Sequence, residues 1–105
     1  MNRWNIPAWL EREVMARDLA CIYCGTDFSL PSASRGTRPS WEHIVNDARI
    51  ITPGNIARCC MSCNASKGAK ELSLWLASHY CERKGITEKT VAQVVRGALS
   101  PSPTD

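Results

Sequence analysis

Two short cysteine pairs dominate this sequence: Cys21–Cys24 (CIYC) and Cys60–Cys63 (CMSC). In each pair two residues separate the cysteines, so one tight turn can place both sulfurs on the same side. Residues 25–59 separate the two pairs, and together the pairs can supply four thiolates to one tetrahedral zinc ion. The alternative interpretation of the same spacing is a pair of disulfides.

The beginning of the chain favours zinc over disulfides. Residues 1–7 show no apolar run followed by a small-residue cleavage site, so we expect a cytoplasmic protein in a reducing compartment. There, cysteines at this spacing are more often metal ligands than disulfide partners. We therefore predict a structural zinc ion on Cys21, Cys24, Cys60 and Cys63, with no open coordination position for catalysis. The other two cysteines, Cys59 and Cys81, are interpreted as buried packing residues.

Length and composition indicate one small domain. The chain has 105 residues, of which 44% are hydrophobic, and it lacks any apolar stretch near the roughly 20 residues that span a bilayer. This excludes a two-domain enzyme and a membrane-spanning protein. We predict one domain over residues 1–99, with a core at about 12–70, helices over 70–99, and a disordered tail at 100–105.

The distribution of charge points to a polyanionic partner. The formal net charge is +3, and all of the excess positive charge lies in the segment 28–70. One basic face of this kind suits nucleic acid, and an ordinary solvated basic surface is the alternative.

Local patterns predict a small α+β fold. Residues 7–18 have the spacing of an amphipathic helix, 29–40 form a polar loop, and 41–45 and 56–59 are short strands. Helix signals return from residue 64, and one apolar stripe then precedes a terminating Gly85. The stripe consists of Leu72, Trp75, Leu76, His79 and Tyr80.

A last helix is predicted after Gly85. Thr87 is expected to cap it, with Ile86 and Val91 forming a hydrophobic staple across the cap. Its buried face would consist of Val91, Val94, Val95, Ala98 and Leu99.

Polar residues between and just after the cysteine pairs carry the chemistry. Glu42 and His43 are adjacent, and Asn64 follows directly after the second cysteine pair. Hydrolysis of a phosphodiester needs a base to deprotonate water, which His43 could supply. It also needs a cation, and the oxygens of Glu42 and Asn64 are hard ligands that suit Mg²⁺ or Mn²⁺.

The order of these motifs along the chain resembles that in the HNH endonucleases, whose active site is a ββα-metal unit. The shared frame runs from Cys21–Cys24 through Glu42-His43 and Asn55 to Cys60–Cys63, with Asn64 and Lys67-Gly68 after it. The resemblance covers about residues 12–68 and implies a treble-clef-like core stapled by a four-cysteine zinc. It also implies two strands, ending at His43 and lying near 56–59, and a helix that begins near Cys63.

The resemblance also assigns roles to residues. It implies that His43 is the general base, that Glu42 and Asn64 bind one catalytic Mg²⁺ or Mn²⁺ ion, and that Asn55 orients the loop and His43. The family's products carry 5′-phosphate and 3′-hydroxyl ends.

DNA, taken as double-stranded, is the expected partner. No membrane partner is expected. Basic residues placed to contact phosphates are Arg35, Arg38, Arg49, Arg58 and Lys67. Such contacts give weak sequence preference. A homodimer would allow one complex to cut both strands, whereas a single chain would nick.

The sequence therefore predicts a metal-dependent DNA endonuclease. The alternative is a non-catalytic zinc-stabilised module that binds nucleic acid through the same basic face, with Glu42 in place of the aspartate more frequent in the family. A redox-sensing thiol protein is a third interpretation, weakened by four cysteines assigned to zinc.

Taken one at a time, Asn55 is also typical of a turn and Asn64 of a helix cap. Trp41 is interpreted as a strand core residue rather than a stacking surface for a base.

Overall fold

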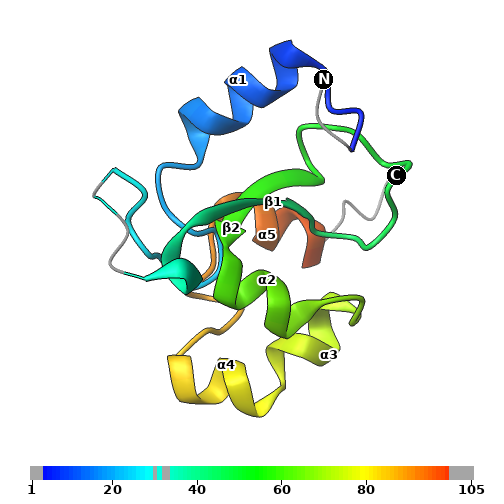
Figure 1. Cartoon of the computed structure of the whole chain (residues 1–105). Coiled ribbons are helices and arrows are strands. Elements are labelled where there is room, and N and C mark those ends of the chain that lie inside the picture. Colours follow the sequence, from blue (N-terminus) through cyan, green and yellow to red (C-terminus); the bar gives the residue numbers. More distant parts are fainter. Residues whose placement is uncertain (1–3, 30, 32–33, 100–105) are drawn as a thin grey trace.

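The computed structural model describes residues 4–29, 31 and 34–99, and it shows a small α+β fold built on one two-stranded antiparallel sheet. Five α-helices and a short 3₁₀ turn surround the sheet in these residues (Figure 1). The predicted disordered tail, 100–105, lies outside the described residues. No helix in the described part of the chain is long and apolar enough to cross a bilayer.

The sheet pairs β1 (Pro39–His43) with β2 (Ile56–Cys60). Its register places His43 opposite Ile56 and Pro39 opposite Cys60. Both strands lie within two residues of the predicted ranges, although β1 begins earlier, inside the predicted polar loop. That loop also contains the 3₁₀ turn η1 (Arg35–Thr37).

One side of the sheet is covered by α1 (Ala8–Arg17), close to the predicted 7–18 (Figure 1). Its buried residues Leu10 and Val14 join Ile6 and Ile56 in a cluster that we call the α1 cluster. Trp4, Trp41 and Ile51 pack against the edge of this cluster. Apolar burial thus fixes α1 against β2.

The end of α1 is also held by polar bonds. Arg17 donates from Nη1 to the carbonyl oxygen of Pro53 at 2.7 Å and from Nη2 to that of Ile56 at 2.9 Å. The buried Asp18 accepts from Arg17 and from the backbone N–H of Arg58. These bonds fix the loop 44–55 against the helix.

The other side of the sheet carries the main core. It is covered by α2 (Met61–Lys67), α3 (Leu72–Leu76), α4 (His79–Lys84) and α5 (Gln93–Leu99). Figure 1 shows α2, α3 and α4 together on the side of the sheet away from α1. Trp75 is fully buried at its centre, with its ring 4.8 Å from that of Tyr23.

The predicted apolar stripe is divided between two helices rather than one. Ser78 ends the continuity because its side chain accepts a hydrogen bond from the backbone N–H of Cys81 and so caps a new helix. His79 is then the exposed first residue of α4, so its predicted packing role is wrong. Gly85 ends α4 in the left-handed conformation, at φ 70°, as predicted.

The predicted start of the last helix is wrong. Thr87 begins a turn, accepting at its carbonyl from Thr90 and Val91, and α5 starts only at Gln93. The reason is long-range: the backbone N–H of Ala92 donates to the carbonyl of Ile22 at 2.9 Å. The chain is thereby tied to the first cysteine turn before it becomes helical. Ile86 and Val91 are both buried, but no helix begins between them, so the predicted staple is not formed.

Candidate functional site: a four-sulfur cluster beside a polar cleft

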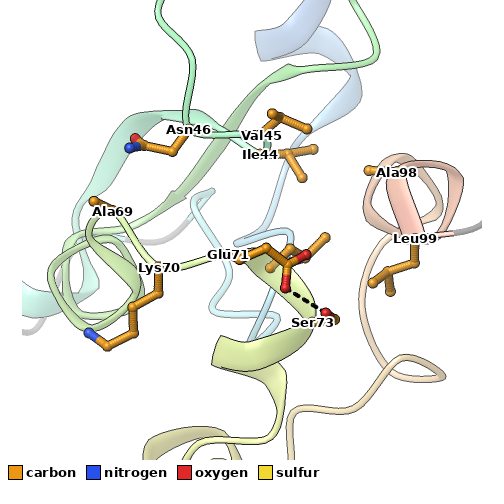
Figure 2. A pocket seen from close by; sticks show the side chains of 10 residues that line it. Ile44, Val45, Asn46, Ala69, Lys70, Glu71, Ser73, Ala98 and Leu99 are labelled. Atoms are coloured by element: carbon orange, nitrogen blue, oxygen red, sulfur yellow. Dashed lines mark hydrogen bonds between the residues drawn. The ribbon is translucent and has the colours of Figure 1, made fainter.

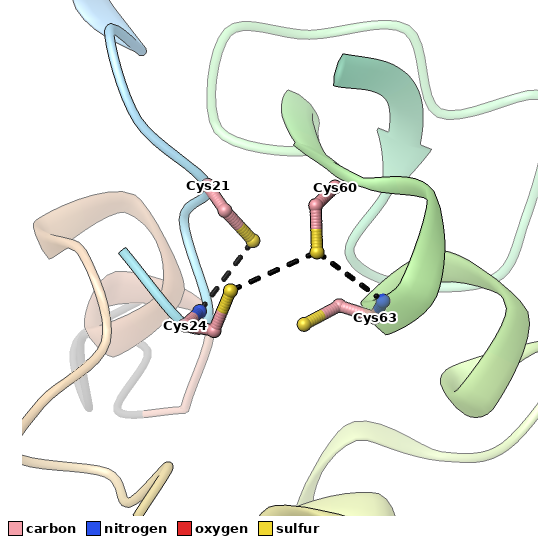
Figure 3. A group of neighbouring side chains, drawn as sticks. All are labelled: Cys21, Cys24, Cys60 and Cys63. Carbon is pink, nitrogen blue, oxygen red and sulfur yellow. Dashed lines mark hydrogen bonds between the residues drawn. The ribbon is translucent and has the colours of Figure 1, made fainter. Parts of the chain in front are cut away.

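The four predicted cysteines come together. Their sulfur atoms all lie within 4.8 Å of one another (Figure 3). Sγ of Cys24 lies 3.7 Å from Sγ of Cys60. Four sulfurs about 2.3 Å from a tetrahedral ion would be about 3.8 Å apart, so this spacing suits a metal ion. The group comprises Cys21, Cys24, Cys60 and Cys63.

The two halves of the cluster share one local geometry. The backbone N–H of Cys24 donates to Sγ of Cys21 at 3.4 Å, and that of Cys63 donates to Sγ of Cys60 at 3.4 Å. The first half is a tight turn followed by Gly25 at φ 82°. The second half is the first turn of α2, with Cys60 as its N-cap. In both halves a backbone donor is in place to stabilise a thiolate.

Hydrogen bonds between the sulfurs shift the pKa values of the four thiols in opposite directions. They lower the pKa of Cys24 and lower that of Cys60 to about 7, whereas they raise the pKa of Cys21 and of Cys63. The hydroxyl of Tyr80 donates to Sγ of Cys63 at 3.3 Å. Four thiolates are the ligand set of structural zinc sites, so the cluster could hold a metal ion such as zinc.

The remaining two cysteines lie in the interior, as predicted. Cys59 and Cys81 are fully buried, and burial raises the pKa of both thiols. Neither belongs to the four-sulfur group.

Next to this cluster lies a cleft of about 640 Å³ between β1 and α2, with Trp4 at its border. One face of α2 lines it at helical spacing, through Met61, Asn64 and Ala65, and the C-cap Gly68 follows. The strand side consists of Ser40, Trp41, Glu42 and His43, followed by Asn46 and Ala48 of the next loop. The cleft therefore collects three of the predicted site residues: Glu42, His43 and Asn64.

Glu42 is held from the interior by one of its two oxygens. Oε2 accepts a hydrogen bond from the hydroxyl of Tyr23 at 2.6 Å and lies 3.1 Å from Nζ of Lys67. All three residues are buried, with 5%, 2% and 1% exposure for Glu42, Tyr23 and Lys67. No described residue bonds the other oxygen, Oε1.

Asn64 is anchored in a similar way. Its Nδ2 donates to Oγ of Ser40 at 2.9 Å and to the carbonyl of Trp41 at 3.0 Å, which joins α2 to β1. These bonds leave the amide oxygen Oδ1 without a partner among the described residues. Each side chain is thus fixed through one polar atom, Oε2 of Glu42 or Nδ2 of Asn64. The second polar atom of each is a hard oxygen without a hydrogen bond to a described residue.

His43 lies at the end of β1 and is 8% exposed. Its Nε2 is the one fully enclosed side-chain polar atom without a hydrogen-bond partner in the described part of the chain. The ring contacts Trp4 edge-on, with the ring centres 5.2 Å apart. Burial lowers the pKa of His43, which favours the neutral imidazole that a general base must be.

Asn55 closes the loop that follows His43. Its Oδ1 accepts from the backbone N–H of Val45 at 2.7 Å, and its Nδ2 donates to the carbonyls of Val45 and Ile50. The side chain is buried and lies outside the cleft lining. Its contacts fix the backbone directly after His43.

The five predicted phosphate contacts separate into three groups. Arg35, Arg38 and Arg49 are exposed, and Arg49 forms a surface ion pair with Asp47 at 2.9 Å. Arg58 is half-buried and lies over the ring of Phe28 at 5.3 Å. The predicted phosphate contact of Lys67 is wrong. Its side chain lies in the interior beside Glu42, where no backbone phosphate can reach it.

A second cavity, of about 380 Å³, lies between the start of the loop after β1, the α2–α3 connection and α5 (Figure 2). Its acidic residue already has a local role, since Glu71 accepts from Ser73 and from the backbone N–H of Leu74 at the start of α3. Lys70 donates to the carbonyl of Ser66. This cavity brings together none of the predicted site residues.

Sequence reasoning missed Tyr23 and Trp4. Tyr23 lies between two cysteines of one turn, and nothing in the local pattern indicates its bond to Glu42. Trp4 precedes the first helix, and its contact with His43 depends on how α1 packs across the sheet.

No protein-family model and no curated protein matches the sequence, and no solved structure matches the fold. The fold and site define a small α+β protein with a four-cysteine cluster able to hold a metal ion, beside a polar cleft.

The buried pair of Glu42 and Lys67 gives a stability prediction. Lys67→Met should lower the free energy of unfolding by about 3–5 kcal/mol, because it leaves a buried carboxylate without its cation. Adding Glu42→Gln should recover part of the loss. Urea unfolding measures both, with the exposed Lys70→Met as control, expected within about 0.5 kcal/mol of the parent. A Lys67→Met protein as stable as the control would show that the pair is not formed.

Proposed function

We propose that this chain is a metal-dependent DNA endonuclease of the HNH type, with a structural zinc ion on the four cysteines. The observation that carries the proposal is the cleft, whose lining includes His43, Glu42 and Asn64. Glu42 and Asn64 each have one side-chain oxygen without a hydrogen bond to a described residue. A base and two hard oxygen ligands are the groups that metal-assisted phosphodiester hydrolysis requires.

Glu42 and Asn64 are the residues that would hold the catalytic Mg²⁺ or Mn²⁺. When bound, the ion supplies positive charge to the phosphate and to the leaving oxygen. Tyr23 and Lys67 keep Glu42 in one position, and Ser40 and the backbone of Trp41 do the same for Asn64. Both side chains are therefore restrained before any ion binds, which lowers the entropic cost of binding.

His43 acts as the general base in this proposal. The water oxygen attacks phosphorus while His43 takes the water's proton, and the bond from phosphorus to the 3′ oxygen breaks. The products are a 5′-phosphate and a 3′-hydroxyl, whose proton comes from solvent. Asn55 supports His43 by fixing the backbone at Val45.

The zinc ion would contribute to the proposed activity by fixing the position of α2. Cys60 ends β2 and Cys63 directly precedes Asn64, so an ion on these sulfurs sets the start of α2 relative to the sheet. Its link to Cys21 and Cys24 holds Tyr23 in the same region, beside Glu42. The metal cluster and the cleft are thus coupled through short stretches of backbone.

The competing function is a zinc-stabilised module that binds nucleic acid without cutting it. The ion pair favours this alternative, because Lys67 already balances the charge of Glu42 and so weakens its attraction for a second cation. The exposed Arg35, Arg38 and Arg49 would serve such a module equally well.

Conversion of supercoiled plasmid to nicked and linear forms distinguishes the two functions. With Mg²⁺ or Mn²⁺ the protein should cut, and His43→Ala should lower the rate roughly 100- to 10,000-fold. His79→Ala is the matched control, since this second histidine is exposed on α4 and should keep full activity. DNA binding without metal-dependent cutting, or full cutting by His43→Ala, would contradict the nuclease.

Zinc removal is predicted to unfold the chain. The protein should contain one zinc ion, and strong chelation or Cys63→Ser should remove it together with the cooperative melt, because a small core depends on the metal for folding. Cys81→Ala should keep the zinc, since Cys81 is buried outside the cluster. Elemental analysis and thermal melting measure both effects. A melt unchanged by chelation would refute the structural ion.

A further inference from the structure

Two tryptophans border the same cleft as His43 and Asn64. Trp4 and Trp41 are both half-buried, and both pack against the α1 cluster while lining the cleft. Trp4 and His43 additionally form a T-shaped ring pair, with the ring centres 5.2 Å apart. The α1 cluster therefore supports an aromatic wall on the cleft, next to the proposed reacting groups.

Exposed arginines flank the lining segment 40–48 along the chain. Arg38 stands two residues before Ser40 and Arg49 directly after Ala48, and Ser40 and Ala48 both line the cleft. The ion pair of Arg49 with Asp47 is on the surface, with 90% of the Arg49 side chain exposed, so a phosphate can compete for it. Cations therefore lie close in the chain to two residues of the cleft lining, which suits a polyanionic ligand.

We propose that this cleft binds an unstacked nucleobase of the DNA strand against Trp41 and Trp4. This inference rests on the proposed nuclease function and narrows its substrate to a strand with an unpaired nucleotide. It replaces the intact duplex that the sequence analysis favoured. The volume of about 640 Å³ falls within the range of sites that enclose a small ligand.

Physical reasons favour a base over another apolar ligand. A base has two π faces that can stack on an indole ring, and every base can do so regardless of sequence. Asn46, which also lines the cleft, carries an amide that can bond the edge of a base. In an intact duplex both faces of each base are covered, so a base must leave the stack before it can reach Trp41.

The test measures binding of a fluorescently labelled single DNA strand to the zinc-loaded protein without Mg²⁺ or Mn²⁺. Fluorescence anisotropy reports the binding. Trp41→Leu and Trp4→Leu should each weaken binding about tenfold, within the range measured for loss of one stacked base. Trp41→Phe should keep most of the affinity. Trp9→Leu is the matched control, because Trp9 is 53% exposed on α1 and lies outside the cleft lining.

A second arm alters the DNA instead of the protein, since Trp41 also packs against the α1 cluster and its loss can weaken the fold. A strand of the same length carrying abasic nucleotides should bind the unaltered protein about tenfold more weakly than the intact strand. Equal binding of the two strands would overturn the inference. Tighter binding of an intact duplex, unaffected by Trp41→Leu, would also overturn it.

The outcome separates this inference from the proposed function. Base-dependent binding by a protein that cuts no DNA would keep the stacking site and refute the nuclease. Metal-dependent cutting with no dependence on bases or on Trp41 would keep the nuclease and refute the stacking site.

Discussion

The packing of four sulfurs into one group is the constraint on which the rest of the structure depends. It joins a turn near residue 21 to the point where β2 becomes α2. Four thiolates at this spacing would repel one another, and a metal ion bound among them would offset that repulsion. In a chain of this size the binding free energy of such an ion would be comparable with the net free energy of folding.

The geometry of the cleft depends on this junction between the first cysteine turn, β2 and α2. Asn64 directly follows Cys63, the last cysteine of the cluster, and its side chain hydrogen-bonds to β1. Tyr23 lies within the first cysteine turn, and its hydroxyl hydrogen-bonds to Glu42. The same few residues therefore link the metal cluster to both proposed ligands of the second ion. The bonds at Glu42 and Asn64 use one atom of each side chain and leave one oxygen of each unbonded, an arrangement that serves structure and chemistry together.

Short-range patterns in the sequence predicted much of this fold. The spacing of the cysteines was enough to predict that they meet, and turn and strand signals located β1 and β2 to within two residues. The start of α5 could not be predicted, because a bond from Ala92 to the distant Ile22 decides it. The interior position of Lys67 was missed for the same reason, since its partner Glu42 lies on another element. A lysine after a helix turn carries no local sign of burial.

The central claim is that the cleft holds a divalent ion distinct from the one on the cysteines. Binding of Mn²⁺ to the zinc-loaded protein, followed by electron paramagnetic resonance, tests it directly. We expect one Mn²⁺ per chain, lost in Asn64→Leu and kept in Asn46→Ala, which alters another amide of the same cleft. No bound Mn²⁺ in the parent protein, or equal binding by Asn64→Leu, would contradict the account.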